Sequence, residues 1–188
     1  MDEVSILLTL YSVVAGLGIS RLVQGVSDMI RSRADLRFDW VHTGWVCIIF
    51  LSHIVTWFAL MRFAKGAHWT VFNAVLALMV PIVLYVVSDL VVPRFDGDDH
   101  FDLGQYFDTN ARWLHGLMLA AVACAFVVQI AVERQTDLAG GGALRLACAL
   151  VLAVGFMSTS RRTHQFVTVA MLLVLVSGSA LVSIRLMQ

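Results

Sequence analysis

The sequence predicts an all-α membrane protein, a polytopic helix bundle that forms a single domain over residues 1–188. Two observations predict this class. Hydrophobic residues make up 60% of the chain and charged residues only 14%, whereas a soluble domain is about half apolar and a quarter charged. The apolar residues are also gathered into stretches of about 20 residues, which is the length that a helix needs to cross a hydrocarbon core.

We expect six transmembrane helices from the apolar periodicity and the polar segments that interrupt it. The first helix is longer than a hydrocarbon core, so it must tilt or project from the bilayer. Pro81 lies inside the third helix and should kink it. Only residues 160–164 join the fifth helix to the sixth, which predicts a tight antiparallel pair. The predicted ranges are 4–30, 41–61, 70–92, 113–132, 141–159 and 165–187.

The segment 93–112 is the one long loop. Within it Leu103, Tyr106, Phe107 and Ala111 recur at helical spacing, which indicates a short helix lying in the membrane interface between the third and fourth spans. A helix in that place is positioned to act as a lid over polar residues at the ends of the spans.

Acidic residues of the same loop recur at near-alternate positions, as the oxygen ligands of calcium and magnesium sites do. Their spacing differs from that of a helix-loop-helix calcium motif, so a solvated acidic loop is the favoured interpretation and the presence of a metal stays open. The acidic residues are Asp96, Asp98, Asp99 and Asp102, and His100 lies among them.

The distribution of basic residues predicts the orientation. In a six-span protein the loops after the first, third and fifth helices share one face, and the positive-inside rule makes the more basic face cytoplasmic. That face and its borders hold Arg31, Arg33, Arg37, Arg94, Arg112, Arg161 and Arg162. The other face holds Arg62, Lys65, Arg134, Arg145 and Arg185. Both termini are therefore expected outside the cytoplasm.

Polar residues inside the spans gather toward the predicted cytoplasmic side. Arg21, Gln24 and Asp28 follow i, i+3 and i+7 spacing, so they share one stripe of the first helix. A charge inside a span is costly, by roughly 2.5 to 3.5 kcal/mol on insertion scales. Asp89 is the expected partner of Arg21, because a guanidinium matches a carboxylate and Asp28 lies about 10 Å away along the same helix. The pair is either a structural ion pair or part of a ligand site.

Further polar residues lie at the same ends of the other helices, which predicts a polar chamber in the cytoplasmic half. His53 stands apart in the middle of the second span, where a hydrogen bond between helices is the favoured role and a proton or ligand contact the alternative. The residues at the helix ends are His42, Ser88, Arg112, His115 and His164, with Tyr85 one turn before Asp89. The candidate residues of a ligand or ion pathway are Arg21, Gln24, Asp28, His53, Tyr85, Asp89, Arg112 and His115.

Small residues on the first helix predict close helix contacts, within one subunit or between subunits. They are Gly16, Gly18, Ser20 and Gly25, and the sixth helix has a similar group in Ser177, Gly178, Ser179 and Ser183.

Several classes of protein lack support in the sequence. A net charge of zero, from 13 basic and 13 acidic residues, indicates no general attraction to nucleic acid. No nucleophile elbow, zinc-binding helix, P-loop or dinucleotide motif supports catalysis, although an enzyme stays open. A haem between two membrane histidines needs both at similar depth, and only His53 lies mid-span, so no cofactor is expected.

A family resemblance adds a location. The run from Gly16 to Leu22, together with Tyr106, Phe107 and the run from Asn110 to Trp113, is similar to a group of multi-pass proteins of bacterial inner membranes. The resemblance implies an inner-membrane protein embedded in the lipid bilayer, and it carries no activity.

Two functions fit these observations. The first is transport or binding of a small ligand or ion, with an anion as the natural guest of Arg21 and Arg112, in a protein that self-associates into a homo-oligomer. The second is a structural or accessory subunit that assembles with other membrane subunits, because the chain is small and has no strong motif.

Overall fold

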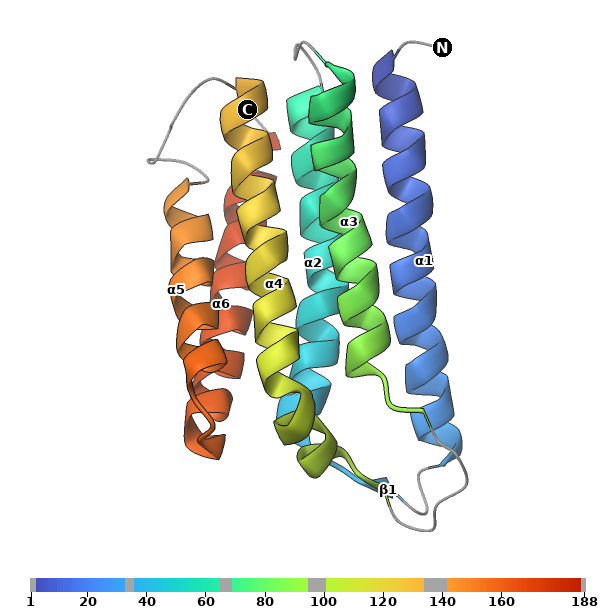
Figure 1. Cartoon of the computed structure of the whole chain (residues 1–188), viewed down its shortest axis with the longest axis vertical. Helices are drawn as coiled ribbons and strands as arrows, with labels where there is room; N and C mark the ends of the chain where they lie inside the picture. Colours follow the sequence, from blue (N-terminus) through green and yellow to red (C-terminus); the bar gives the residue numbers. More distant parts are fainter. Residues whose placement is uncertain (1–2, 33–35, 65–68, 95–100, 134–141, 187–188) are drawn as a thin grey trace.

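The computed structural model describes residues 3–32, 36–64, 69–94, 101–133 and 142–186 of the chain. Six helices stand side by side and alternate in direction, and they form an up-and-down bundle (Figure 1). The helices are α1 (Glu3–Arg31), α2 (Trp40–Ala64), α3 (Val71–Val91), α4 (Leu103–Glu133), α5 (Ala143–Met157) and α6 (Arg161–Leu186). The predicted helical bundle is confirmed.

Four helices are long and apolar enough to cross a membrane. The candidate spans are Val4–Arg31, Trp40–Met61, Val71–Val91 and Leu103–Ala131. The apolar helix α5 has 15 residues, which is about 22 Å of helix and less than a hydrocarbon core of about 30 Å. Four candidate spans are thus established among the described residues, whereas six spans stay a prediction.

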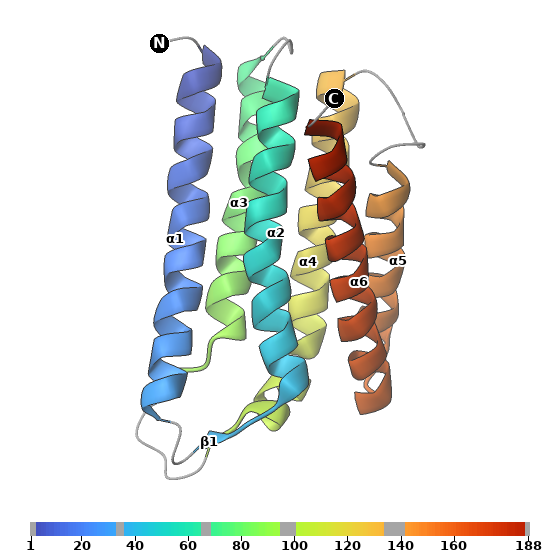
Figure 2. The same cartoon turned by 180° about the vertical axis from the view of Figure 1, so that it is seen from behind.

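The helices pack in two layers. The helices α1, α3, α4 and α5 form one row, in which each contacts the next, and α2 and α6 lie together behind that row (Figures 1 and 2). The core between the layers contains buried Trp45 from α2, Val87 from α3, Leu114 from α4 and Leu152 from α5. Because α2 contacts α1, α3, α4 and α6, it is the central helix of the bundle.

Two short strands join the connections at one end of the bundle. The strand β1 (Leu36–Arg37) follows α1, β2 (Phe101–Asp102) precedes α4, and the two pair in parallel with Leu36 opposite Phe101. The Asp102 carboxylate accepts hydrogen bonds from the backbone N–H groups of Gly104 (2.8 Å) and Gln105 (3.1 Å), as a residue preceding a helix does. This end of the molecule is called the strand end below.

The short interfacial helix predicted between the third and fourth spans is not confirmed, because α4 runs without interruption from Leu103 to Glu133. The physical reason lies in the sequence, since no proline breaks the helix after Asp102 caps it. The apolar side chains that suggested a membrane surface are buried in the protein instead, with Leu103, Phe107 and Ala111 each about 2% exposed. The lid that depended on this helix is withdrawn with it.

Candidate functional site

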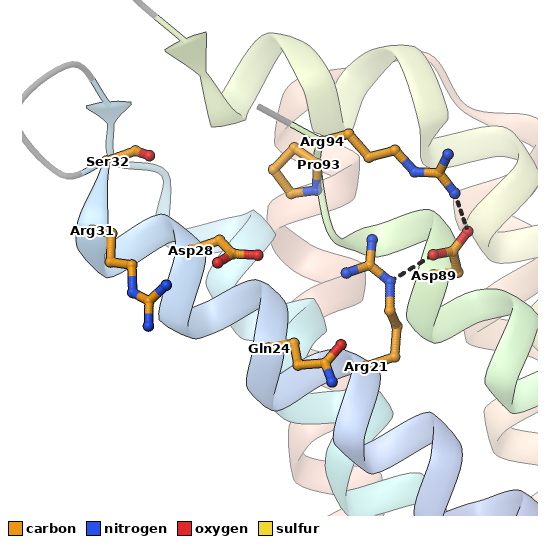
Figure 3. Close-up of a pocket in the computed structure, with 8 residues that line it drawn as sticks. All are labelled: Arg21, Gln24, Asp28, Arg31, Ser32, Asp89, Pro93 and Arg94. Atoms are coloured by element: carbon orange, nitrogen blue, oxygen red, sulfur yellow. Dashed lines mark hydrogen bonds and ion pairs between the residues drawn. The ribbon is translucent and has the colours of Figure 1, made fainter. Parts of the chain in front are cut away.

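An open cleft lies between α1 and α3 at the strand end (Figure 3). Its volume is about 590 Å³. We name it the α1/α3 cleft, and its lining comes from one stripe of α1, from the last turn of α3 and from the residues that follow each helix. The lining residues are Arg21, Gln24, Asp28, Arg31, Ser32, Asp89, Pro93 and Arg94.

The predicted pair of Arg21 and Asp89 is confirmed. Nε of Arg21 donates to Oδ1 of Asp89 at 2.6 Å, and the two side chains are 20% and 38% exposed. The second carboxylate oxygen, Oδ2, accepts from a terminal nitrogen of Arg94 at 3.3 Å. One carboxylate therefore fixes two guanidinium groups, one from each side of the cleft.

The pair leaves hydrogen-bond donors for another molecule. A guanidinium has five N–H donors, and Arg21 contacts Asp89 through Nε alone. Both terminal nitrogens of Arg21 turn away from Asp89, toward the open side of the cleft and toward Asp28 (Figure 3). Arg94 is 75% exposed, so its remaining donors are also accessible. Asp89 acts as a positioning residue for these two arginines.

The depth of Arg21 differs from the sequence interpretation. Asp89 lies two residues before Val91, the last residue of α3, so its partner Arg21 is level with the end of that helix. The helix α1 continues past this level to Arg31 (Figure 1), a further length of about 15 Å. Arg21 is thus inside its own helix but at the end of the neighbouring span, where a charge is much less costly than at the bilayer centre.

The four histidines within the described residues form a second region, which is closed. Nε2 of His42 lies 2.8 Å from the carbonyl oxygen of Val91, and Nε2 of His53 lies 3.0 Å from Oγ of Ser88. The Ser88 hydroxyl donates to the carbonyl of Leu84 at 2.8 Å, so it accepts from His53. Nε2 therefore carries a proton in both rings, and the two hydrogen bonds tie α2 to α3.

The other two histidines that the structure describes lie between α4, α5 and α6. The rings of His115 and His164 stack with centroids 5.3 Å apart, and the Trp45 ring meets His115 edge-on at 4.8 Å. Nδ1 of His115 donates to the carbonyl oxygen of Ala111 within the same helix. A methyl group added at Gly155 of α5 would overlap the His115 ring, so α4 and α5 meet closely here. We name the buried residues His42, His53, Ser88, His115 and His164 the histidine core.

The structure divides the eight predicted site residues into three groups. Arg21, Gln24, Asp28 and Asp89 line the α1/α3 cleft, whereas His53 and His115 belong to the histidine core. Arg112 packs on the Phe156 ring at 5.2 Å from its centroid, and Tyr85 is 40% exposed on α3, one turn before Asp89. The single chamber predicted from the sequence is therefore an open cleft beside a closed core.

Four lining residues were missed as site residues, namely Arg31, Ser32, Pro93 and Arg94. Arg31 and Arg94 entered the sequence argument only through their charge. A signal was present in the spacing, because Arg94 follows Asp89 by five residues, just beyond the end of α3, where a long side chain can reach back to the last turn.

A further ion-pair group lies at the strand end. Arg161 of α6 pairs with Asp39 and with Asp108, the latter at 2.7 Å, and its guanidinium lies 5.8 Å from the Phe107 ring centroid. This group joins α6 to the starts of α2 and α4. Within the described ranges no three His, Cys, Asp or Glu side chains come together as a metal site. The loop residues Asp96, Asp98, Asp99 and His100 lie outside the described residues.

Comparison of the chain with models of protein families, with curated proteins and with solved structures finds no match. The family resemblance therefore carries no further argument, and any function must be argued from the site.

Proposed function

We propose that this protein is a helical membrane protein that binds a small anionic ligand in the α1/α3 cleft. The observation that carries the proposal is the geometry of Asp89. Its two carboxylate oxygens hold Arg21 and Arg94, and the terminal nitrogens of Arg21 face open space (Figure 3). Guanidinium groups arranged in this way recognise phosphate and carboxylate.

The charges of the lining favour an anion. Three arginines (Arg21, Arg31 and Arg94) against two aspartates (Asp28 and Asp89) leave one positive charge. A purely structural ion pair has no need of a second arginine or of an open cleft. The exposure of Asp89, at 38%, also means that the pair contributes little to stability, because exposed ion pairs are worth up to about 1 kcal/mol.

The proposal has a wider form that includes transport of the same ligand by a homo-oligomer in the bacterial inner membrane. In this form all six helices cross the membrane, both termini are extracytoplasmic, and the strand end faces the cytoplasm. The excess of arginine at that end supports the orientation.

Titration with inorganic phosphate tests the binding proposal. The full chain in a non-ionic detergent should unfold at a higher temperature with phosphate than with chloride of equal ionic strength, because a ligand that binds only the folded state stabilises it. Arg94→Gln should weaken the apparent phosphate affinity at least tenfold. An equal response to the two anions would refute the proposal.

Arg37→Gln is the matched control. Arg37 is also exposed, lies at the same end of the bundle and pairs with one carboxylate, that of Asp102 at 3.1 Å, but it does not line the cleft. It should leave phosphate affinity unchanged. An equal loss in both variants would mean that phosphate responds to general surface charge, and the proposal would fail.

A second candidate function is that of an accessory subunit, and the shortness of α5 favours it. The described helix has 15 residues and is shorter than a hydrocarbon core of about 30 Å, and in this second function a helix of another protein packs beside it. Purification in a mild detergent separates the two functions. A stoichiometric second subunit supports the accessory role, and a chain that purifies alone and binds phosphate supports the ligand site.

A further inference from the structure

The α1/α3 cleft continues into an apolar surface. On α1, Leu17 lies one turn before Arg21 and is 56% exposed. On α3, Tyr85 and Ile82 lie one and two turns before Asp89 and are also exposed. Residues at these spacings share a helix face with the charged residue. The charged residues of the cleft and these exposed apolar residues therefore lie on the same faces of α1 and α3.

The level of the cleft matches that of lipid headgroups. The span Val71–Val91 has 21 residues, or about 31 Å of helix, and this length equals the thickness of a hydrocarbon core. Asp89 lies at the end of this span, so Arg21 and Arg94, which it holds, lie where the apolar core gives way to phosphate groups. The exposed residues Leu17, Tyr85 and Ile82 lie one to two turns deeper, at the level of the acyl chains.

The charges and donors of the cleft fit a phosphodiester. A phosphodiester carries one negative charge, which equals the net positive charge of the lining, and it presents two oxygens to donors. The terminal nitrogens of Arg21 and the free donors of Arg94 supply charge-assisted hydrogen bonds from two sides. The carboxylate of Asp28, which also lines the cleft, can accept hydrogen bonds from headgroup hydroxyls.

From this juxtaposition we propose that the occupant of the α1/α3 cleft is an anionic phospholipid, its phosphodiester held by Arg21 and Arg94 and its acyl chain lying on Leu17, Tyr85 and Ile82. This inference rests on the proposed anion site and names its ligand class. The cleft is open, and it lies at α1, the outermost helix of its row, so a lipid can reach it from the bilayer without passing through the protein.

Native mass spectrometry in a non-ionic detergent tests the proposal with phosphatidylglycerol, with phosphatidylcholine as the zwitterionic lipid and with glycerol 3-phosphate as the soluble phosphate. We expect one phosphatidylglycerol per chain to be retained at least tenfold more tightly than phosphatidylcholine. Arg94→Gln should remove this preference, and glycerol 3-phosphate at equal concentration should not displace the lipid. Equal retention of the two lipids would overturn the proposal.

Substitution of Tyr85 separates a lipid from a soluble ligand. Tyr85→Ser should weaken the retention of phosphatidylglycerol several-fold and leave the affinity for inorganic phosphate unchanged, because the ring contacts only the acyl chain. Val75→Ser is the matched control, since Val75 is also exposed on α3 but lies far from the cleft. Equal effects of the two variants would overturn the proposal.

The two levels of the proposal fail in different ways. If inorganic phosphate and glycerol 3-phosphate bind through Arg94 as tightly as phosphatidylglycerol does, the site takes a soluble anion, and the lipid inference is wrong while the anion site stands. If Arg94→Gln changes the binding of neither phosphate nor lipid, the anion site and the lipid inference are both wrong.

Discussion

The α1/α3 cleft and the histidine core lie at the same end of the bundle, but they treat polar groups in opposite ways. In the cleft, Arg21 and Asp89 are partly exposed, and donors of Arg21 face open space. In the core, His42, His53 and Ser88 are buried, and each hydrogen bond that they make ends within the protein.

Ser88 and Asp89 show how narrow the boundary between the two regions is. They are adjacent in the sequence, yet the helix turns Ser88 toward His53 of α2 and Asp89 toward Arg21 of α1. Successive residues of a helix point about 100° apart, so one turn of α3 serves both regions. A polar residue at this end of the bundle therefore has a role set by its helix face and not by its depth.

The largest effect is expected where the histidine core meets α1. A methyl group at Gly18 would overlap the His53 ring, so Gly18→Ala should force α1 away from α2. Overpacking of this kind costs about 1 to 3 kcal/mol, and thermal unfolding in detergent should show a clear decrease in Tm. Gly16→Ala is the control on the same helix, because nothing lies within 4 Å of a methyl group there. Equal Tm values for the two variants would contradict close packing at Gly18.

An intermediate effect is expected for Ser88→Ala and Asp89→Asn, which divide stability from binding. Ser88→Ala leaves the His53 N–H without its acceptor. The loss of this interhelical hydrogen bond should lower the stability by about 1 kcal/mol. Phosphate affinity should stay the same. Asp89→Asn raises the net charge of the lining from one to two, but it removes the carboxylate that orients Arg21 and Arg94. We expect the loss of orientation to dominate, so that phosphate binding weakens while stability changes by less than about 1 kcal/mol. Thermal unfolding with and without phosphate measures both effects. If Ser88→Ala weakened binding as much as Asp89→Asn, the two regions would be one chamber.

The pairing of Arg21 with Asp89 was predictable from the sequence, because few charges occur inside the spans and topology brings the end of the third helix beside the first. The predicted helix ranges were also close to those of the structure, apart from the start of α4. Apolar periodicity identifies such helices well, since it reflects the length of a span and the face that is buried.

The level of Arg21 and the separation of cleft from core were not predictable. Periodicity shows which residues share a face of one helix, but it fixes neither the rotation of that helix nor its shift along a neighbour. Arg21 is level with the end of α3 only because α1 extends past that end. His53 and His115 were assigned to a ligand pathway for the same reason. The sequence predicted how deep they lie in the spans but not the direction in which their side chains point.

The smallest effect is expected at Asp102, which belongs to neither region. Hydrogen bonds from the backbone N–H of Gln105 and of Gly104, with the nearby Arg37 guanidinium, hold the pKa of Asp102 below its ordinary value. A carboxyl with a lowered folded-state pKa adds stability above its unfolded pKa of about 3.9, and this stability is lost as the pH falls through the folded-state pKa. At neutral pH Asp102→Ala should lower stability by about 0.5 kcal/mol, the low end of the range for the loss of a helix cap, and the difference from the wild type should shrink below about pH 4.

Asp102→Asn separates the cap from the charge. Asparagine caps helices about as well as aspartate, so this variant should keep most of the stability at neutral pH and lose the acid dependence, as measured by thermal unfolding over a pH series. Phosphate affinity should equal that of the wild type in both variants, because Asp102 does not line the cleft. A weaker phosphate response in Asp102→Asn would extend the α1/α3 cleft to the strand pair and would show that its anion site depends on the whole strand end.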